Sequence, residues 1–146
     1  MKILVINGVN MNMLGVREPE KYGHMTLKDL EKELYAYSFE LGIDIETFQS
    51  NHEGEIVEKI QQAYHNASGI VLNAAAYTHT SVAIRDAIAS VNIPTIEVHM
   101  TNIHSREDFR QKSLIAGVCK GQISGFGIDS YKLAMQALCT MLKKQS

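Results

Sequence analysis

The 146-residue sequence has no tryptophan, only two prolines and two cysteines, and no long apolar run. Cys119 and Cys139 lack the spacing of metal ligands or of a disulfide framework, so we expect two unpaired thiols. No apolar stretch approaches the roughly 18 residues of a membrane span, and residues 2–6 do not resemble a signal peptide. We therefore expect a cytoplasmic protein without a membrane partner.

An excess of charge of either sign is also missing. Lys and Arg number 14 against 16 for Asp and Glu, a formal net charge of -2. Without a basic surplus, nucleic acid is a poor partner for this chain. With 45% hydrophobic residues, the chain fits one globular domain that buries roughly 70% of its unfolded surface. We predict a single domain over residues 1–146.

Short β-branched runs alternate with amphipathic stretches, which is typical of βαβ units. We predict strands at residues 2–7, 43–49, 70–73, 95–99 and 122–127. We predict helices at residues 27–41, 54–64, 80–90 and 130–143, and a short one behind a capping box at 105–108. With right-handed crossovers, these elements predict an α/β fold: a flavodoxin-like, doubly wound five-stranded parallel sheet with helices on both faces.

The segment after the first strand, residues 7–23, is long and polar. Connections in such units usually take about 2 to 6 residues, so this segment is more typical of a lid or binding loop. Polar residues also follow the third and fourth strands, at 73–85 and 97–110. Ligands of doubly wound sheets bind outside the carboxyl ends of the strands. We therefore expect one site to gather all three segments.

These segments are specific enough to indicate a family. Residues 8–23 read GVNMNMLGVREPEKYG, residues 77–87 read YTHTSVAIRDA, and residues 97–102 read EVHMTN, followed by Arg106 and Arg110. Their order and spacing resemble those of the type II 3-dehydroquinate dehydratases over essentially the whole chain. The resemblance implies a hydro-lyase of the shikimate pathway, which leads to chorismate and the aromatic amino acids. Its implied reaction is the reversible anti elimination of water from 3-dehydroquinate to 3-dehydroshikimate through an enolate, without a metal or an organic cofactor.

The resemblance also implies catalytic roles. Tyr22 matches the general base of the family, and Arg17 matches its essential arginine. A free tyrosine has a pKa near 10 and is almost wholly neutral at pH 7, so a neighbouring cation is needed to stabilise its phenolate. His99 matches the general acid for the leaving hydroxyl, and Glu97, two residues earlier on the same strand face, matches its orienting carboxylate.

The remaining matches imply substrate binding and an assembly. Asn10 matches an asparagine that holds an ordered water against the developing enolate. Asp86 matches a residue that family members lend to a neighbouring subunit, which implies a homo-oligomer, a dodecamer built from trimers. Other implied substrate contacts are Asn73, His79, Arg110 and the backbone amides of Met100 and Thr101.

Several positions depart from the family pattern without removing a catalytic group. Thr101 replaces the usual serine, Ser130 replaces a glycine, and Ala74–Ala75 replace a segment that usually contains glycine. The methyl group of Ala75 is expected near the carboxylate pocket, where it affects the Michaelis constant.

Other classes share this sheet order. A flavin-binding electron carrier needs a Ser/Thr-rich phosphate cradle after the first strand, and a phospho-receiver module needs acidic residues there, where this chain has Asn7 and Gly8. The alternative that stays open is a catalytically lapsed family member that serves as a small-molecule binding or assembly protein.

Overall fold

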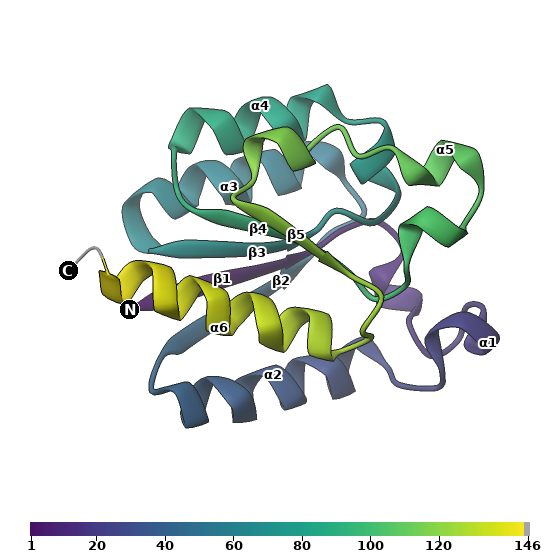
Figure 1. Cartoon of the computed structure of the whole chain (residues 1–146), viewed down its shortest axis with the longest axis horizontal. Helices are drawn as coiled ribbons and strands as arrows, with labels where there is room; N and C mark the ends of the chain where they lie inside the picture. The colour runs from purple at the N-terminus through teal and green to yellow at the C-terminus, as the bar shows by residue number, and fades with distance from the viewer. Residues whose placement is uncertain (145–146) are drawn as a thin grey trace.

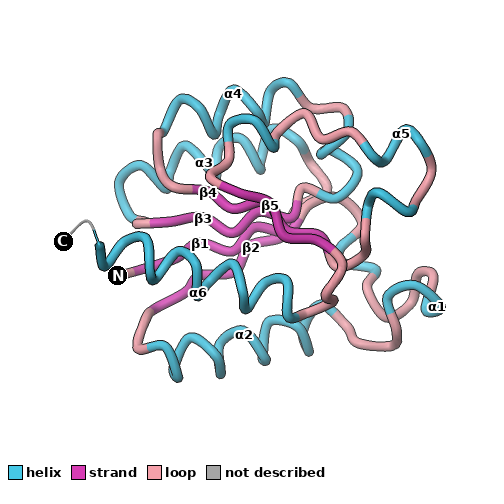
Figure 2. The backbone as a smooth tube through the Cα atoms, in the orientation of Figure 1, coloured by secondary structure: helices cyan, strands magenta, loops and turns pink. Residues whose placement is uncertain are grey.

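The computed structural model describes residues 1–144, and for Lys21 and Tyr22 it describes the backbone alone. Within this range, five parallel strands form one sheet in the order β2-β1-β3-β4-β5 (Figure 2). The strands are β1 (Lys2–Asn7), β2 (Asp44–Gln49), β3 (Gly69–Asn73), β4 (Thr95–His99) and β5 (Gly121–Ser124). This order confirms the predicted flavodoxin-like, doubly wound sheet.

Helices cover both faces of the sheet (Figure 1). On one face lie α2 (Leu27–Leu41) and α6 (Asp129–Lys144), and on the other lie α3 (Glu53–Asn66) and α4 (Val82–Val91). Successive strand residues point to opposite faces, so Ile3 and Val5 pack in the α2/α6 core while Leu4 and Ile6 pack in the α3/α4 core. Burial on both faces explains why the central strands are almost continuously apolar.

The short helices gather at the carboxyl ends of the strands. Figure 1 shows α1 (Pro19–Tyr22) and α5 (Asp108–Gln111) both at this end of the molecule. Within the described part of the chain, four 3-10 turns complete the fold: η1 (Met11–Met13), η2 (Ala75–His79), η3 (Ile103–Ser105) and η4 (Ala116–Val118).

Local sequence signals set the bounds of α2. The Thr26 hydroxyl accepts a hydrogen bond from the Asp29 N–H at 3.1 Å, and the Asp29 carboxylate accepts one from the Thr26 N–H at 3.1 Å. This is the predicted capping box. At the other end, Gly42 adopts a left-handed conformation with φ 70°, which closes the helix as predicted.

The predicted capping box at residues 105–108 is wrong. Asn102 caps η3 instead, with its side-chain oxygen accepting from the His104 N–H at 3.1 Å. The Ser105 hydroxyl donates to the Asn102 carbonyl at 2.9 Å, and Ser105 is itself the last residue of η3, two residues before the N-cap of α5 at Glu107. The helix α5 begins at Asp108 without a side-chain cap.

Other predicted bounds also shift, and two of the shifts have a clear local cause. The helix expected from residue 80 begins at Val82, because the Ser81 hydroxyl caps it by accepting from the Ile84 N–H at 2.9 Å. The last strand ends at Ser124 rather than at residue 127, because Gly125 leaves the extended conformation with φ 100°.

Gly8 brings the first loop against the loop that follows β3. Its N–H donates to the Asn73 carbonyl at 2.8 Å. A Cβ atom at this position would lie 2.4 Å from the Ala74 carbonyl oxygen, which is far inside van der Waals contact. Only glycine permits this close approach of two backbones.

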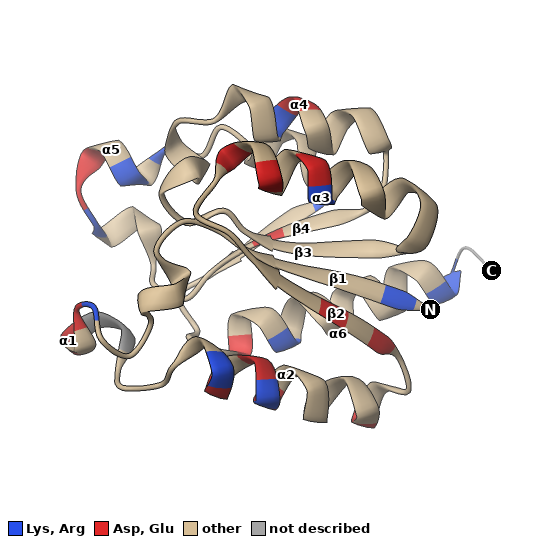
Figure 3. Ribbon diagram, turned by 180° about the vertical axis from the view of Figure 1, so that it is seen from behind, with Lys and Arg blue, Asp and Glu red and all other residues tan. Residues whose placement is uncertain are grey.

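Charged residues lie mainly on the helices and loops. Figure 3, which views the molecule from behind, shows both signs together on α2 and on α5, with few charges within the sheet. No helix among the described residues is long and apolar enough to span a membrane.

Candidate active site

A recess lies at the carboxyl ends of β1, β3 and β4. It encloses about 660 Å³, open solvent at its mouth included. All three polar segments of the sequence contribute to its wall. The lining residues are Asn10, Met11, Leu14, Arg17, Asn73, Ala75, Ala76, His79, His99, Met100, Thr101, Ile103, Arg106 and Arg110.

Most of the site residues expected from the sequence line this recess. Two of the described ones, Glu97 and Asp86, do not. Glu97 is fully buried behind His99. Asp86 is exposed on α4 and is not among the lining residues. The side chain of Tyr22 lies outside the described part of the chain.

Glu97 and His99 form a buried pair at the end of β4. The His99 Nε2 atom meets the Glu97 Oε2 atom, and the histidine is only 6% exposed. Because Nε2 is engaged with Glu97, the other ring nitrogen, Nδ1, remains to exchange a proton with a molecule in the recess. The carboxylate thereby sets both the orientation and the tautomer of the imidazole.

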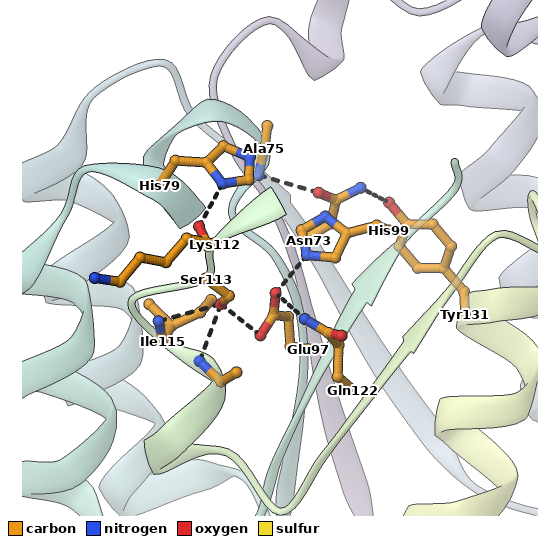
Figure 4. A network of polar contacts seen from close by, with 11 residues as sticks. Asn73, Ala75, His79, Glu97, His99, Lys112, Ser113, Ile115, Gln122 and Tyr131 are labelled. Atoms are coloured by element: carbon orange, nitrogen blue, oxygen red, sulfur yellow. Dashed lines mark hydrogen bonds and ion pairs between the residues drawn. The ribbon is translucent and has the colours of Figure 1, made fainter. Parts of the chain in front are cut away.

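Two further donors hold the Glu97 carboxylate (Figure 4). The Ser113 hydroxyl donates to Oε1 at 2.9 Å, and the Gln122 amide donates to Oε2 at 3.0 Å. Burial alone would raise the pKa of Glu97, but the hydrogen bond and the charge of His99, with the bonds from Gln122 and Ser113, outweigh burial and lower that pKa. Glu97 is therefore ionised at neutral pH.

The segment 112–116 places Ser113 against Glu97. Its backbone is fixed by η2 and α4: the Leu114 N–H donates to the Thr78 carbonyl at 2.9 Å, and the Arg85 guanidinium donates to the Leu114 carbonyl at 2.7 Å. The His79 Nδ1 atom also lies 2.8 Å from the Lys112 carbonyl. His79 in the wall of the recess and Ser113, which donates to Glu97, thus belong to one connected network (Figure 4).

Sequence reasoning missed Ser113 and Gln122. Each is a polar residue without special spacing to Glu97, 16 and 25 residues away along the chain. Their role arises from tertiary contact, so no local sequence signal identifies it.

Positive charge is concentrated at the recess. Arg17, Arg106 and Arg110 contribute to the lining together with two histidines, and none of the described side chains in that lining is acidic. The chain as a whole has a formal net charge of -2, so this potential is local. Carboxylates set back from the wall hold the cations: the Arg110 Nε atom lies 2.8 Å from the Glu107 carboxylate. Such a site favours a small anion.

Arg17 lies at the rim with a carboxylate beside it. Its Nη2 atom is 3.5 Å from the Glu18 Oε2 atom, at a contact where both side chains are partly exposed. An exposed ion pair of this kind contributes little to stability.

Asn10 and Ala75, both in the wall, adopt left-handed backbone conformations. Asn10 has φ 69° and Ala75 has φ 54°. Asparagine tolerates this region, whereas the conformation costs alanine about 1–2 kcal/mol. Hydrogen bonds hold both in place: the Asn10 N–H donates to the Asn51 side chain at 2.9 Å, and the Ala75 N–H donates to the Asn73 side chain at 3.0 Å.

Within residues 1–144, apart from the side chains of Lys21 and Tyr22, no group of three or more His, Cys, Asp or Glu side chains is arranged to hold a metal ion. The groups at the recess are instead a buried acid–base pair, amides and guanidinium groups. This set is suited to proton transfer on a small anionic molecule.

The fold and the site together define an α/β protein of flavodoxin-like topology with an acid–base site at its strand ends. A family model described as dehydroquinase class II matches residues 1–139, and the chain belongs to this family.

Relatives in sequence and in structure agree with this assignment. The 3-dehydroquinate dehydratase of a Nitratiruptor species is 59% identical over 138 residues, which are 94% of this chain and 88% of that protein. The 3-dehydroquinate dehydratase of Geotalea daltonii is 56% identical over 144 residues, which are 99% of this chain and 100% of that protein. The crystal structure of type II dehydroquinase from Butyrivibrio crossotus superposes with a TM-score of 0.93 at 51% identity, covering 94% of this chain and 97% of that one.

Proposed function

We propose that this protein catalyses the reversible anti elimination of water from 3-dehydroquinate to give 3-dehydroshikimate, a step of the shikimate pathway. The observation that carries the proposal is the buried Glu97–His99 pair at a recess lined by arginines, in a chain of the class II dehydroquinase family. The substrate is a small carboxylate, which suits the cationic wall.

His99 acts as the general acid. The hydroxyl that leaves from the substrate needs a proton, and the imidazole supplies it from the ring nitrogen that is not bonded to Glu97. The ionised Glu97 fixes the tautomer of the ring and keeps it aimed at the recess.

Tyr22 acts as the general base that removes a proton α to the ketone. This role comes from its match to the family motif, since its side chain lies outside the described part of the chain. Arg17 stabilises the phenolate by its charge, and α1, which ends at Tyr22, belongs to the loop that follows β1. The electron pair of the broken C–H bond passes to the ketone oxygen as an enolate, and its return expels the hydroxyl as water.

The remaining residues hold the substrate and the enolate. Asn10, which lines the recess, positions a water against the enolate oxygen. Asn73, His79 and Arg110 bind substrate oxygens, and the backbone amides of Met100 and Thr101 receive the carboxylate.

Asp86 completes the site of a neighbouring subunit in a homododecamer of trimers. Its exposure on α4, away from its own recess, supports this role. Solution mass measured by light scattering tests the assembly, and a fully active monomer would contradict the role of Asp86. The cytoplasmic location expected from the sequence stays a prediction.

Tyr22→Phe tests the mechanism. The product is a conjugated enone that absorbs in the near ultraviolet, so turnover is followed directly by absorbance. We expect the variant to lose at least about a thousandfold in kcat, because it removes the base itself, while its thermal unfolding stays unchanged. Tyr35→Phe is the matched control, since Tyr35 is a half-exposed residue of α2 outside the recess, and it keeps full activity. Near-normal turnover in Tyr22→Phe would refute the assignment.

A further inference from the structure

The buried side chain of Tyr131 links Asn73, a lining residue of the recess, to Asn7 on the neighbouring strand. Tyr131 of α6 is 0% exposed, and its hydroxyl lies between two asparagines that face each other at the ends of β1 and β3. The Asn73 amide donates to this hydroxyl at 2.8 Å, and the hydroxyl donates to the Asn7 side-chain oxygen at 2.5 Å. Tyr131 does not line the recess, whereas Asn73 does.

This contact helps to fix which way the Asn73 amide points (Figure 4). The amide oxygen accepts from the Ala75 N–H at 3.0 Å, so an exchange of oxygen and nitrogen would set two donors against each other. On the other side, the amide nitrogen gives one hydrogen to Tyr131, and Met11 Sδ lies 3.8 Å from it as a weak acceptor. The amide therefore keeps one acceptor site and one weakly used hydrogen for a ligand.

The protonation state of Tyr131 favours this arrangement. Burial raises the pKa of its hydroxyl far above the neutral range, so the hydroxyl stays a donor to Asn7 at any working pH. With Asn7 accepting its hydrogen, the oxygen of Tyr131 is left as an acceptor facing Asn73.

We propose that Tyr131 is a positioning residue that holds the Asn73 amide for the substrate and, through Asn73, holds the left-handed Ala75 in the wall of the recess. The inference rests on the proposed function, because it needs Asn73 to bind the substrate. Tyr131 acts through Asn73 and touches no reacting atom. Its loss therefore weakens substrate binding, with a larger effect on KM than on kcat.

Tyr131→Phe removes one oxygen and keeps the ring in the core. We expect KM for 3-dehydroquinate to rise about fivefold, the equivalent of one neutral hydrogen bond, with kcat changed by less than about twofold. Asn73→Ala raises KM more. In the double variant Tyr131→Phe/Asn73→Ala, KM equals that of Asn73→Ala alone, because the tyrosine has no amide left to position.

A matched control separates positioning from stability. Thr95→Val also deletes a buried hydroxyl, which donates to the Ile93 carbonyl at 2.9 Å at the opposite end of β4. It is expected to lower thermal stability and leave KM unchanged. If Tyr131→Phe does not fold, Asn7→Ala removes the acceptor of the tyrosine hydroxyl instead, and a rise of about twofold in KM is expected.

The possible results distinguish a failure of the positioning role from a failure of the proposed function. An unchanged KM in Tyr131→Phe, or KM effects of Tyr131→Phe and Asn73→Ala that multiply in the double variant, would overturn the positioning role while the proposed function stands. If the unmodified protein binds 3-dehydroquinate without turnover, the proposed function fails, and the same comparison of the four proteins by Kd from titration calorimetry decides the positioning role. Absence of both binding and turnover overturns both.

Discussion

Replacing Ser113 by alanine tests the idea that Ser113, together with His99 and Gln122, keeps Glu97 ionised. The change removes the donor that lies 2.9 Å from Glu97 Oε1, in a carboxylate that is fully buried. It also removes the acceptor of the Ile115 and Ala116 N–H groups, at 3.3 and 3.0 Å. Ser113 is not a lining residue, so the substitution reaches the recess through Glu97 and His99.

The expected magnitude follows from these contacts. A hydrogen bond to a charged group contributes about 1.5–3 kcal/mol, and the loss of the acceptor of two backbone N–H groups adds a further part. We expect the free energy of unfolding at pH 7 to fall by about 2–4 kcal/mol. If the altered Glu97–His99 pair raises the activation free energy by about 1.4 kcal/mol, kcat falls about tenfold.

The pH dependence of the unfolding free energy tests the role of Ser113 more specifically. Because the folded-state pKa of Glu97 is lowered, its carboxylate stabilises the fold above its unfolded-state pKa, and that contribution is lost as the pH falls through the lower folded-state pKa. Ser113→Ala raises the folded-state pKa. The difference in stability between the variant and the unmodified protein is therefore largest at neutral pH and shrinks in the acid range below the ordinary pKa of glutamate.

Urea denaturation at a series of pH values measures this difference directly. Ser90→Ala is the matched control, because the Ser90 hydroxyl donates to a neutral carbonyl, that of Asp86, at an exposed position. It should change the unfolding free energy by less than about 0.5 kcal/mol at every pH. A Ser113→Ala destabilisation that stays constant from neutral to acid pH would show that Ser113 does not support the ionised form of Glu97.

Two backbone predictions concern the loops that meet at the recess. Gly8→Ala forces a Cβ atom to within 2.4 Å of the Ala74 carbonyl oxygen, so we expect a loss of about 2–3 kcal/mol in unfolding free energy and a fall in kcat/KM. Gly54→Ala, in α3 with no atom within 4 Å of the new Cβ, should instead stabilise by about 0.5–1 kcal/mol; equal effects would contradict the close-approach argument. Ala75→Gly relieves the left-handed φ of 54° and should stabilise by about 0.5–1 kcal/mol in thermal unfolding, while a loss of stability would show that Ala75 is not strained.

The elements that could be predicted from the sequence are those set by local signals. The Thr26 and Asp29 side chains satisfy each other within one helical turn, and Gly42 supplies the left-handed closure, so the bounds of α2 follow from neighbouring residues. The central strands are equally clear, because burial on both faces demands continuous apolar runs. Their order can be predicted because parallel strands with right-handed crossovers allow few arrangements.

The prediction is wrong where two local signals compete. Ser105 and Asp108 have the spacing of a capping box, but Asn102 caps the turn η3, which takes in Ser105, and α5 begins only at Asp108. An asparagine turn and a serine cap use the same kind of hydrogen bond, so the sequence cannot rank them without the surrounding packing.

In the candidate site, too, residues in local motifs could be predicted and contacts between distant residues could not. Asn10, Arg17 and His99 are recognisable because they stand in contiguous motifs, and the structure brings them to one recess. The groups behind them come from distant parts of the chain: Tyr131 meets Asn7 across 124 residues. Such contacts depend on the register of the whole sheet, which no local pattern encodes.

Equilibration that starts from either compound tests whether the protein is a reversible dehydratase. The unmodified protein is incubated either with 3-dehydroquinate or with 3-dehydroshikimate, and the composition is followed by proton NMR. A reversible dehydratase brings both samples to the same ratio of the two compounds with many turnovers per subunit. Samples that keep their starting compositions, while calorimetry still detects binding of either compound, would contradict the account and identify a binding protein instead.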